Sequence, residues 1–399
     1  MSEEDANAAQ TGGTAEAPGG AQHEVTPEGG ALPGEAGGPV TPEEEGAPSP
    51  APLTLAGSLH HFRWDLDKTY LRTEFDTLRD LIRTYRQSAE EKVVVPGART
   101  LLQELLNADG PDTPRRVTFI SGSPQQMRKV LQERLRLDGI EPAHFLLKPN
   151  LSNILRLRFK AVRGQVGYKL EALLQSRIYA DDVTEMLFGD DAEQDAFIYS
   201  LYADLLRGRV DRATLKAVLD ACHVYAIDQH RIFRLFEHLR PESGTVARIF
   251  IHLDRRSPTR RFNPYGPRVV PVFNWFQAAA VLFGDGVLSE PALLRVLDSM
   301  RGEGYTPLRL ASSLQDLLRR GHLAVSVLGR VGDALDRALD EGVDARGWFL
   351  RQCAMAVEDV HAFQRDVPPW REPIDYVTLA EHTRFRREPL RLPRLRFLD

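Results

Sequence analysis

Two aspartates, Asp65 and Asp67, lie two residues apart in the stretch FRWDLDKTY, which spans residues 62–70. The apolar residues before them predict a strand, and the period-two alternation of a strand points both side chains the same way at its carboxyl end. One carboxylate in such a pair can attack an electrophile while its neighbour transfers the proton of the leaving group. For so short a motif, the alternative is a turn that caps the following helix.

Three more polar segments follow in chain order. The apolar run 117–120 predicts a buried strand that ends in Ser121-Gly122-Ser123-Pro124. Lys169 lies where a helical pattern starts, and the apolar run 183–188 leads into an acidic loop from Gly189 to Asp195. Taken singly, Ser121 could cap a helix and Lys169 could be a surface helix residue. Only the combination and its order indicate a site.

With these motifs the chain resembles the haloacid dehalogenase superfamily of phosphatases, in particular the actin-patch phosphatidate phosphatases and their bacterial relatives. The resemblance rests on the paired aspartates, on Lys169, on an S-x-S-P loop at 121–124 and on a GD-x-x-x-x-D loop at 189–195. It extends over about residues 58–285. It implies an α/β fold with a Rossmann-like parallel sheet flanked by helices.

The resemblance also implies the role of each residue in phosphoryl transfer. Asp65 attacks phosphorus and carries the aspartyl-phosphate, and Asp67 protonates the leaving alkoxide and then activates water. Ser121 and Lys169 hold the phosphoryl oxygens.

The same resemblance implies a magnesium ion, which two close carboxylates need if both are to stay ionised. Its ligands are Asp65, the Asp67 main-chain carbonyl and Asp190, with Asp195 orienting bound waters. The GDD sequence offers two adjacent carboxylates, and we place Asp190 ahead of Asp191 because it directly follows Gly189.

Two features bear on the substrate. Only 47 residues separate Ser121 from Lys169, which leaves no room there for a large cap domain and predicts an open site. Lys68 stands where the lipid phosphatase relatives usually have a third aspartate, which weakens any transfer of their substrate. We therefore expect a phosphatase for a phosphate monoester, a lipid phosphate such as phosphatidate being one candidate. The alternative is a catalytically silent scaffold that keeps the fold.

The composition is that of an ordinary soluble protein, with 42% hydrophobic and 27% charged residues among 399. We find no run of about 18 apolar residues and no secretion signal. The two cysteines, Cys222 and Cys353, are too few for a disulfide framework. These features predict a cytoplasmic protein with reduced thiols.

We divide the chain into four parts: a tail at 1–52, a phosphatase domain at 53–285, a helical accessory region at 286–375 and a basic arm at 376–399. Residues 1–50 carry ten acidic side chains with no Lys or Arg, and almost no large apolar residue. Such a tail cannot offset its ordering entropy by burial, so we expect it to be disordered. A solvating role is favoured over one that shields a basic surface.

The arm interleaves arginines with apolar residues around two prolines. An extended arm packed on this protein or on a partner is favoured over a peripheral contact with anionic lipid. No motif supports nucleic-acid binding, and the oligomeric state stays open. A helix over 74–88 is expected as a flap beside Asp65. The other expected elements are strands at 59–64, 144–147 and 246–253, and helices at 98–107, 125–137, 196–207, 212–221, 230–239, 273–283 and from 290 onward.

Overall fold

The computed structural model describes residues 59–73, 87–107, 114–148, 161–177, 183–240, 244–339, 345–360 and 373–382. The acidic tail, most of the expected helix at 74–88 and the basic arm beyond residue 382 lie outside this part of the chain. Expectations about those segments stay predictions.

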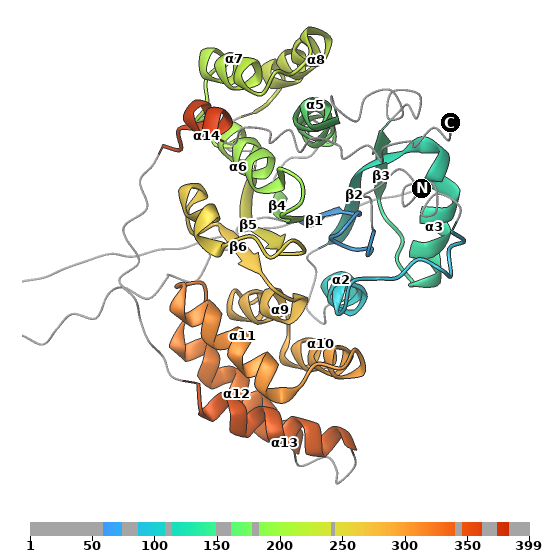
Figure 1. Cartoon of the computed structure of the whole chain (residues 1–399), viewed down its shortest axis with the longest axis vertical. Helices are drawn as coiled ribbons and strands as arrows, with labels where there is room; N and C mark the ends of the chain where they lie inside the picture. The colour runs from blue at the N-terminus through green and yellow to red at the C-terminus, as the bar shows by residue number, and fades with distance from the viewer. Residues whose placement is uncertain are drawn as a thin grey trace, which may run out of the picture. The chain divides into compact units, whose positions relative to one another are not determined.

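Six parallel strands form one sheet in the order β3-β2-β1-β4-β5-β6 (Figure 1). The strands are β1 (Leu59–Asp65), β2 (Arg115–Pro124), β3 (His144–Lys148), β4 (Val183–Asp190), β5 (Gly244–His252) and β6 (Val269–Val272). Every residue of β4 is buried, as is usual for a parallel sheet covered by helices on both faces. The predicted α/β fold with a parallel sheet is confirmed.

One face of the sheet is covered by α2, α3 and α9, with the C-terminal helices packed beyond them (Figure 1). These elements are α2 (Ala98–Asn107), η1 (Gln125–Met127), α3 (Arg128–Leu137), α9 (Trp275–Gly284), α10 (Glu290–Gly302), α11 (Pro307–Arg319), α12 (Val325–Leu339) and α13 (Ala345–Glu358). The core on this face contains an aromatic stack in which Trp64 lies 4.3 Å from Phe188 and 5.0 Å from Trp275 between ring centroids. Trp64 directly precedes Asp65, so this stack packs against the last residues of β1.

The other face is covered by α5 and α6, with α7, α8 and α14 outside them (Figure 1). These elements are α5 (Ala161–Gln175), α6 (Asp195–Leu206), α7 (Arg212–Ala221), α8 (Ala226–Glu237), η2 (Thr259–Tyr265) and α14 (Tyr376–His382). Alternation along β1 directs Phe62 and Trp64 to the first face and Arg63 and Asp65 to this one. Asp65 therefore points toward α5.

The helices α10 to α13 continue the first core, which confirms a helical C-terminal region. Ser289 and Thr306 cap α10 and α11, each followed by a proline within the first turn, as favoured at helix starts. The proposed boundary at residue 285 falls directly after α9. The division into domains stays a prediction.

Several elements differ from expectation. Helix α8 begins at Ala226 rather than at residue 230, and strand β2 extends over Arg115–Pro124 rather than 117–120. Strand β6 was not anticipated, because four residues interrupted by Pro271 give a weak signal that only pairing with β5 completes. Helix α5 begins at Ala161, so Lys169 lies in its middle rather than at its start. Helix α14 begins at the first residue of the expected arm, and Tyr376 donates a hydrogen bond to Asp204 Oδ2 at 2.6 Å. Those seven residues are thereby packed on α6 and α7 as part of the second core.

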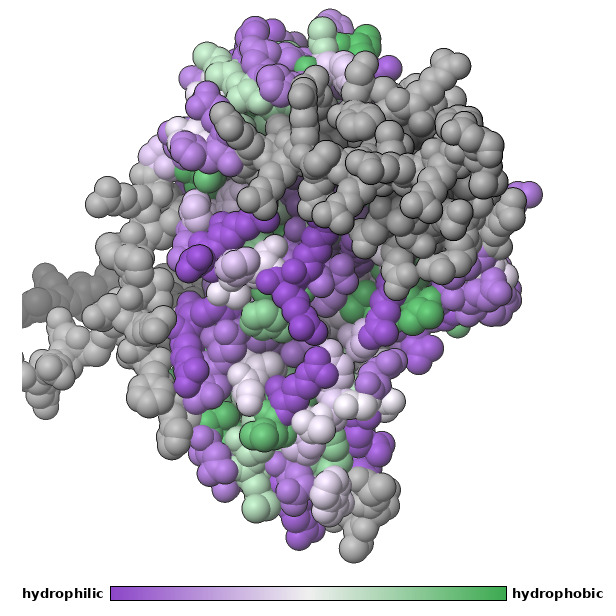
Figure 2. All heavy atoms as spheres, in the orientation of Figure 1, coloured by the Kyte–Doolittle hydropathy of each residue, from purple (hydrophilic) through white to green (hydrophobic). Residues whose placement is uncertain are grey.

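The surface of the described part is mainly hydrophilic on the face seen in Figure 2, where apolar side chains form small separate patches. Within the described residues, no helix is long and apolar enough to cross a membrane.

Candidate active site

The carboxyl ends of β1 and β4 lie side by side where the strand order reverses. From β1 the chain adds β2 and β3 on one side of the sheet and then returns to place β4, β5 and β6 on the other. In open parallel sheets, ligands bind in the crevice at such a reversal, because the loops diverge there. Asp65 is the last residue of β1 and Asp190 is the last residue of β4. The topology therefore brings the two carboxylates to one crevice.

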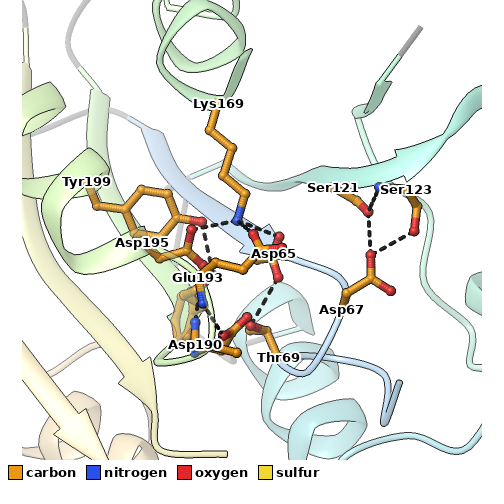
Figure 3. Close-up of polar contacts among 12 residues, drawn as sticks. Asp65, Asp67, Thr69, Ser121, Ser123, Lys169, Asp190, Glu193, Asp195 and Tyr199 are labelled. Carbon is orange, nitrogen blue, oxygen red and sulfur yellow. Dashed lines mark hydrogen bonds and ion pairs between the residues drawn. The ribbon is translucent and has the colours of Figure 1, made fainter. Parts of the chain in front are cut away.

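Lys169 reaches this crevice from α5, and its ammonium lies among three carboxylates (Figure 3). Its Nζ is 2.9 Å from Asp65 Oδ1, 2.5 Å from Asp195 Oδ1 and 2.6 Å from Glu193 Oε2. The Lys169 side chain is completely buried, so the ion pairs are weakly screened by solvent. The structure thus brings Asp65, Lys169, Asp190 and Asp195 together at one place.

The acidic loop that follows β4 is held by its own carboxylates. Asp190 Oδ1 accepts hydrogen bonds from the amides of Ala192 at 2.5 Å and Glu193 at 3.0 Å. Asp195 Oδ2 accepts from the Asp190 amide at 3.2 Å. Asp195 is also the first residue of α6, where the helix dipole favours a carboxylate. These bonds use Asp190 Oδ1 and leave Asp190 Oδ2 without a hydrogen bond from the described residues.

The close approach of Asp195 explains why the acidic loop begins with a glycine, Gly189. A Cβ at this position would lie 2.6 Å from Asp195 Cβ and 2.8 Å from Asp195 Cγ. Only a residue without a side chain allows Asp195 to approach the end of β4 this closely.

The carboxylates fit a divalent cation. Asp65, Asp190, Glu193 and Asp195 each offer an oxygen, and these oxygens lie within 4.8 Å of one another. Asp190 Oδ2 is buried and accepts no hydrogen bond from the described residues, which is costly unless a cation binds it. Lys169 alone does not balance four ionised carboxylates. An all-oxygen donor set of this kind suits a hard cation such as magnesium or calcium.

The pKa values reflect the same excess of buried negative charge. Burial raises the pKa of Asp65 well above its usual range, although the nearby Lys169 ammonium lowers it. Burial also raises the pKa of Asp195 to about 6, again against the effect of Lys169. The pKa of Asp190 is raised well above its usual range by burial and then by the charge of Asp195. A bound cation would favour the ionised carboxylates and reverse these shifts.

Asp67 and the serine loop form a second polar group beside the cluster. Asp67 Oδ2 accepts hydrogen bonds from Ser121 Oγ at 2.9 Å and from Ser123 Oγ at 2.7 Å. Figure 3 shows Asp67 turned toward the serines, while Asp65 faces Lys169. The expectation that both aspartates point the same way is wrong for the side chains, because β1 ends at Asp65 and Asp67 lies in the turn beyond it. Burial raises the pKa of Asp67.

The turn after Asp67 has a constrained backbone. Lys68 adopts a left-handed conformation with φ of 63°, which is uncommon for a residue other than glycine. Its amide donates to Leu71 O at 2.7 Å, and its carbonyl lies 3.0 Å from His252 Nδ1 at the end of β5. Thr69 Oγ1 donates to Asp65 Oδ2 at 3.3 Å. The turn thereby connects β1 to β5 and holds the second oxygen of Asp65.

Asp191 is separated from the cluster by its own contacts. Its Oδ1 accepts from the Arg255 amide and its Oδ2 from the Ser257 amide, both at 2.8 Å. Because both carboxylate oxygens hold the loop after β5, Asp190 rather than Asp191 is the residue available to a cation.

Sequence reasoning missed Glu193 and Ser123. Glu193 lies in the acidic loop and Ser123 in the serine loop, so the motifs contained both. Their residue types did not distinguish them from neighbours such as Asp191 or Ser121. The ion pair with Lys169 and the hydrogen bond to Asp67 do so.

Comparison with known families gives a match to a catalytic domain. Residues 64–216 match the family model described as phosphatidate phosphatase APP1, catalytic domain. The matched segment contains the paired aspartates, the serine loop, Lys169 and the complete acidic loop. A match to this catalytic domain implies phosphatase activity. Comparisons with curated proteins and with solved structures find no match.

Proposed function

From the match over residues 64–216 and the carboxylates at the switch point, we propose that this protein is a magnesium-dependent phosphatase. Its reaction is the hydrolysis of a phosphate monoester through an aspartyl-phosphate on Asp65. We further propose a lipid phosphate such as phosphatidate as the substrate. The observation that carries the proposal is the buried contact of Lys169 with both Asp65 and Asp195, beside the unsatisfied oxygen of Asp190.

In the first step an Asp65 oxygen attacks phosphorus, and the bond from phosphorus to the ester oxygen breaks. Lys169 keeps one Asp65 oxygen in place and Thr69 the other, so the carboxylate is oriented before substrate arrives. Asp67 donates a proton to the departing alkoxide. Its burial raises its pKa, and a carboxyl that retains a proton can act as a general acid.

In the second step water attacks the aspartyl-phosphate, Asp67 takes a proton from that water, and Asp65 is released with inorganic phosphate. Ser121 is assigned to the phosphoryl oxygens, with Ser123 as its neighbour. Both hydroxyls donate to Asp67 in this structure, so they must rotate away from it to bind a phosphate.

Asp65, Asp190 and the Asp67 carbonyl would hold the magnesium ion, which would offset the negative charge that gathers in transfer. Both oxygens of Asp195 already have protein partners, one on Lys169 and one on the Asp190 amide. This supports a role for Asp195 in orienting those two groups and nearby water.

We also propose a cytoplasmic location, which two buried free thiols at Cys222 and Cys353 support.

The test is turnover of a panel of phosphate esters, including an aryl phosphate and phosphatidate in mixed micelles, with magnesium and with a chelator. We expect magnesium-dependent release of phosphate. Asp65→Asn should lower the rate more than about 100-fold, which corresponds to roughly 2.7 kcal/mol of barrier. Acid quenching with substrate labelled at phosphorus should leave label on the wild-type protein and none on Asp65→Asn. A folded protein that hydrolyses no member of the panel would favour the scaffold alternative.

A further inference from the structure

The loop that follows β5 is held rigidly at the border of the candidate active site. Asp191 accepts hydrogen bonds from the amides of Arg255 and Ser257, both at 2.8 Å, and the Arg256 amide donates to Leu253 O at 3.1 Å. Arg256 has a left-handed backbone with φ of 52°. A non-glycine residue keeps such a conformation only where surrounding contacts maintain it. The bonds to Asp191 are contacts of this kind.

This loop borders the site for two reasons. Asp191 directly follows Asp190, and its amide donates to His252 O at 3.0 Å. His252, the last residue of β5, is paired with Asp190 and lies 3.0 Å from the Lys68 carbonyl by its Nδ1. The loop, the turn after Asp67 and the metal ligand candidate Asp190 therefore meet around one histidine.

Three basic and two apolar side chains along this border are exposed to solvent. Arg255 and Arg256 are exposed, as is Arg72, whose amide donates to Val93 O at 2.8 Å. Val93 is 56% exposed, and Phe273, which directly follows β6, is 43% exposed. We call these five residues the basic rim.

The position of Phe273 next to the loop follows from the sheet. The Leu253 amide donates to Val272 O at 2.8 Å, so the first residue of the loop lies against the last residue of β6. Three exposed acidic side chains also lie near the rim: Asp254 in the loop, and Glu90 and Glu91 shortly before Val93. Asp191 is used by the loop amides. Arg260 and Arg261, which follow the loop, add two exposed basic side chains to the three rim arginines, so the basic groups among these described residues outnumber the acidic ones by five to three.

We propose that the basic rim is the surface by which the protein contacts an anionic phospholipid bilayer, with the active site facing the membrane. This inference rests on the proposed function. With the proposed divalent cation bound, four ionised carboxylates and one ammonium still leave the site negative by about one charge, which repels an anionic substrate surface. Arginines at the border offset that repulsion where a negatively charged surface would approach.

The apolar members of the rim favour a bilayer over a soluble anion. Arginines alone would attract either, but exposed Val93 and Phe273 gain free energy only where they can leave water. Amphipathic surfaces of this type insert apolar side chains at the level of the lipid headgroups while basic residues bind the phosphates.

The test measures vesicle binding by the full chain carrying Asp65→Asn, which prevents turnover. The probes are vesicles of phosphatidylcholine alone and of phosphatidylcholine with phosphatidylglycerol, which is anionic but is not a phosphate monoester. Arg255→Gln with Arg256→Gln should weaken binding to the anionic vesicles roughly 10-fold or more, since each basic residue near such a surface contributes severalfold. Phe273→Ser should weaken it as well.

The control is Arg212→Gln with Lys216→Gln, which removes two exposed charges from α7. These residues follow α6, which leads away from the site for 12 residues, about 18 Å at the rise of an α-helix. Binding by the control should stay within twofold of the parent. An equal loss in both double variants, or no loss in the rim variant, would overturn the proposal; the second result would assign any binding to another part of the chain.

A second measurement separates the membrane surface from the substrate itself. In the protein with Asp65 intact, kcat/KM is compared for phosphatidate in anionic vesicles and for a water-soluble aryl phosphate. We expect kcat/KM for phosphatidate in vesicles, divided by kcat/KM for the aryl phosphate, to fall at least fivefold in the variant with Arg255→Gln and Arg256→Gln. If both values fall together, the arginines bind the substrate phosphate, and the bilayer proposal is wrong. If the parent hydrolyses neither substrate, the proposed function fails, while the vesicle-binding comparison still decides on the rim.

Discussion

Lys169 Nζ lies 2.9 Å from Asp65 Oδ1, in a place where neither side chain is more than 1% exposed. Burial by itself would lower the pKa of the lysine, but the carboxylates of Asp195 and Asp65 outweigh this and raise it well above its usual range. The ammonium is therefore a permanent positive charge beside the proposed nucleophile. It favours the ionised, nucleophilic form of Asp65 in a place where burial favours the neutral one.

We predict that Lys169→Met, which keeps the length of the side chain and removes its charge, lowers the rate at least about 100-fold. The metal-free variant should also melt at a lower temperature, because Asp65 and Asp195 lose their buried counter-charge. Added magnesium should recover part of the melting temperature and little of the rate. Melting curves and initial rates with and without magnesium check both statements.

The control for this prediction is Lys216→Met, which removes an exposed lysine of α7 that pairs only with Asp220 among the carboxylates described. Its rate and melting temperature should stay close to the wild type. A Lys169→Met protein with wild-type rate would show that the ammonium takes no part in the reaction.

Asp190 and Asp195 should differ in their effect on the metal. Asp190→Asn replaces the carboxylate whose Oδ2 has no hydrogen-bond partner among the described residues, so magnesium affinity should fall most in this variant. Asp195→Asn should lower affinity by about 10- to 100-fold, as expected for a residue that orients a ligand. Calorimetric titration with magnesium measures both without requiring turnover. A larger loss for Asp195→Asn would exchange the two assignments.

The same substitution should destabilise the protein at one glycine of the site and leave its stability unchanged at another. At Gly189 an added Cβ would meet Asp195 Cβ at 2.6 Å, so Gly189→Ala should cost about 1–3 kcal/mol of stability and weaken metal binding. At Gly122 the nearest atoms to an added Cβ are Gln165 Nε2 at 3.7 Å and Glu193 Oε1 at 3.9 Å, which is ordinary contact. Gly122→Ala should therefore unfold at the wild-type denaturant concentration. Equal stability of the two variants in urea would contradict the close approach.

The buried histidine of β1 should make the protein sensitive to acid. His61 is completely buried, with its Nε2 2.8 Å from Thr118 Oγ1, and burial together with the charges of Arg63 and Arg116 lowers its pKa. The folded protein therefore keeps the ring neutral, while the unfolded chain binds a proton below about pH 6.5. Stability contributed by the neutral ring is present above that pH and is lost as the pH falls below it.

His61→Gln retains a hydrogen-bonding group and cannot titrate. The free energy of unfolding should then fall less steeply with acid, by about 1–2 kcal/mol less than in the wild type between pH 7 and pH 5.5. Urea unfolding at a series of pH values measures this difference. His230→Gln, at an exposed position of α8, is the control and should keep the wild-type slope. Parallel slopes for all three proteins would remove His61 as the cause.

Much of the secondary structure was predictable because its signals are local. Helix α2 has the predicted bounds, since Leu101, Leu102 and Leu105 form a buried stripe with helical spacing. The first strand was predicted to within one residue, because the apolar residues before Asp65 alternate with polar ones along the chain. Strand β6 was not predictable in this way, because its strand character comes from pairing with β5.

The sequence by itself determined which residue types reach the site and from which strands. In a parallel sheet the residues after each strand gather at one edge, so Asp65, Ser121 and Asp190 had to lie close together once the strands were recognised. Lys169 could reach the same residues from any helix that passes the carboxyl edge of the sheet. These conclusions depend on order along the chain, which the sequence contains.

Only the tertiary structure decided which partner each of several similar acidic side chains contacts. Asp190, Asp191 and Glu193 are acidic residues of one loop, and the sequence placed Asp190 first only because it directly follows Gly189, with no role for Glu193. The loop after β5 takes both oxygens of Asp191, Lys169 takes an oxygen of Glu193, and Asp190 keeps an oxygen that accepts no hydrogen bond from the described residues. The physical reason is that each partner comes from a segment distant in sequence. Hydrogen bonds and ion pairs across such distances are set by packing, which no local pattern records.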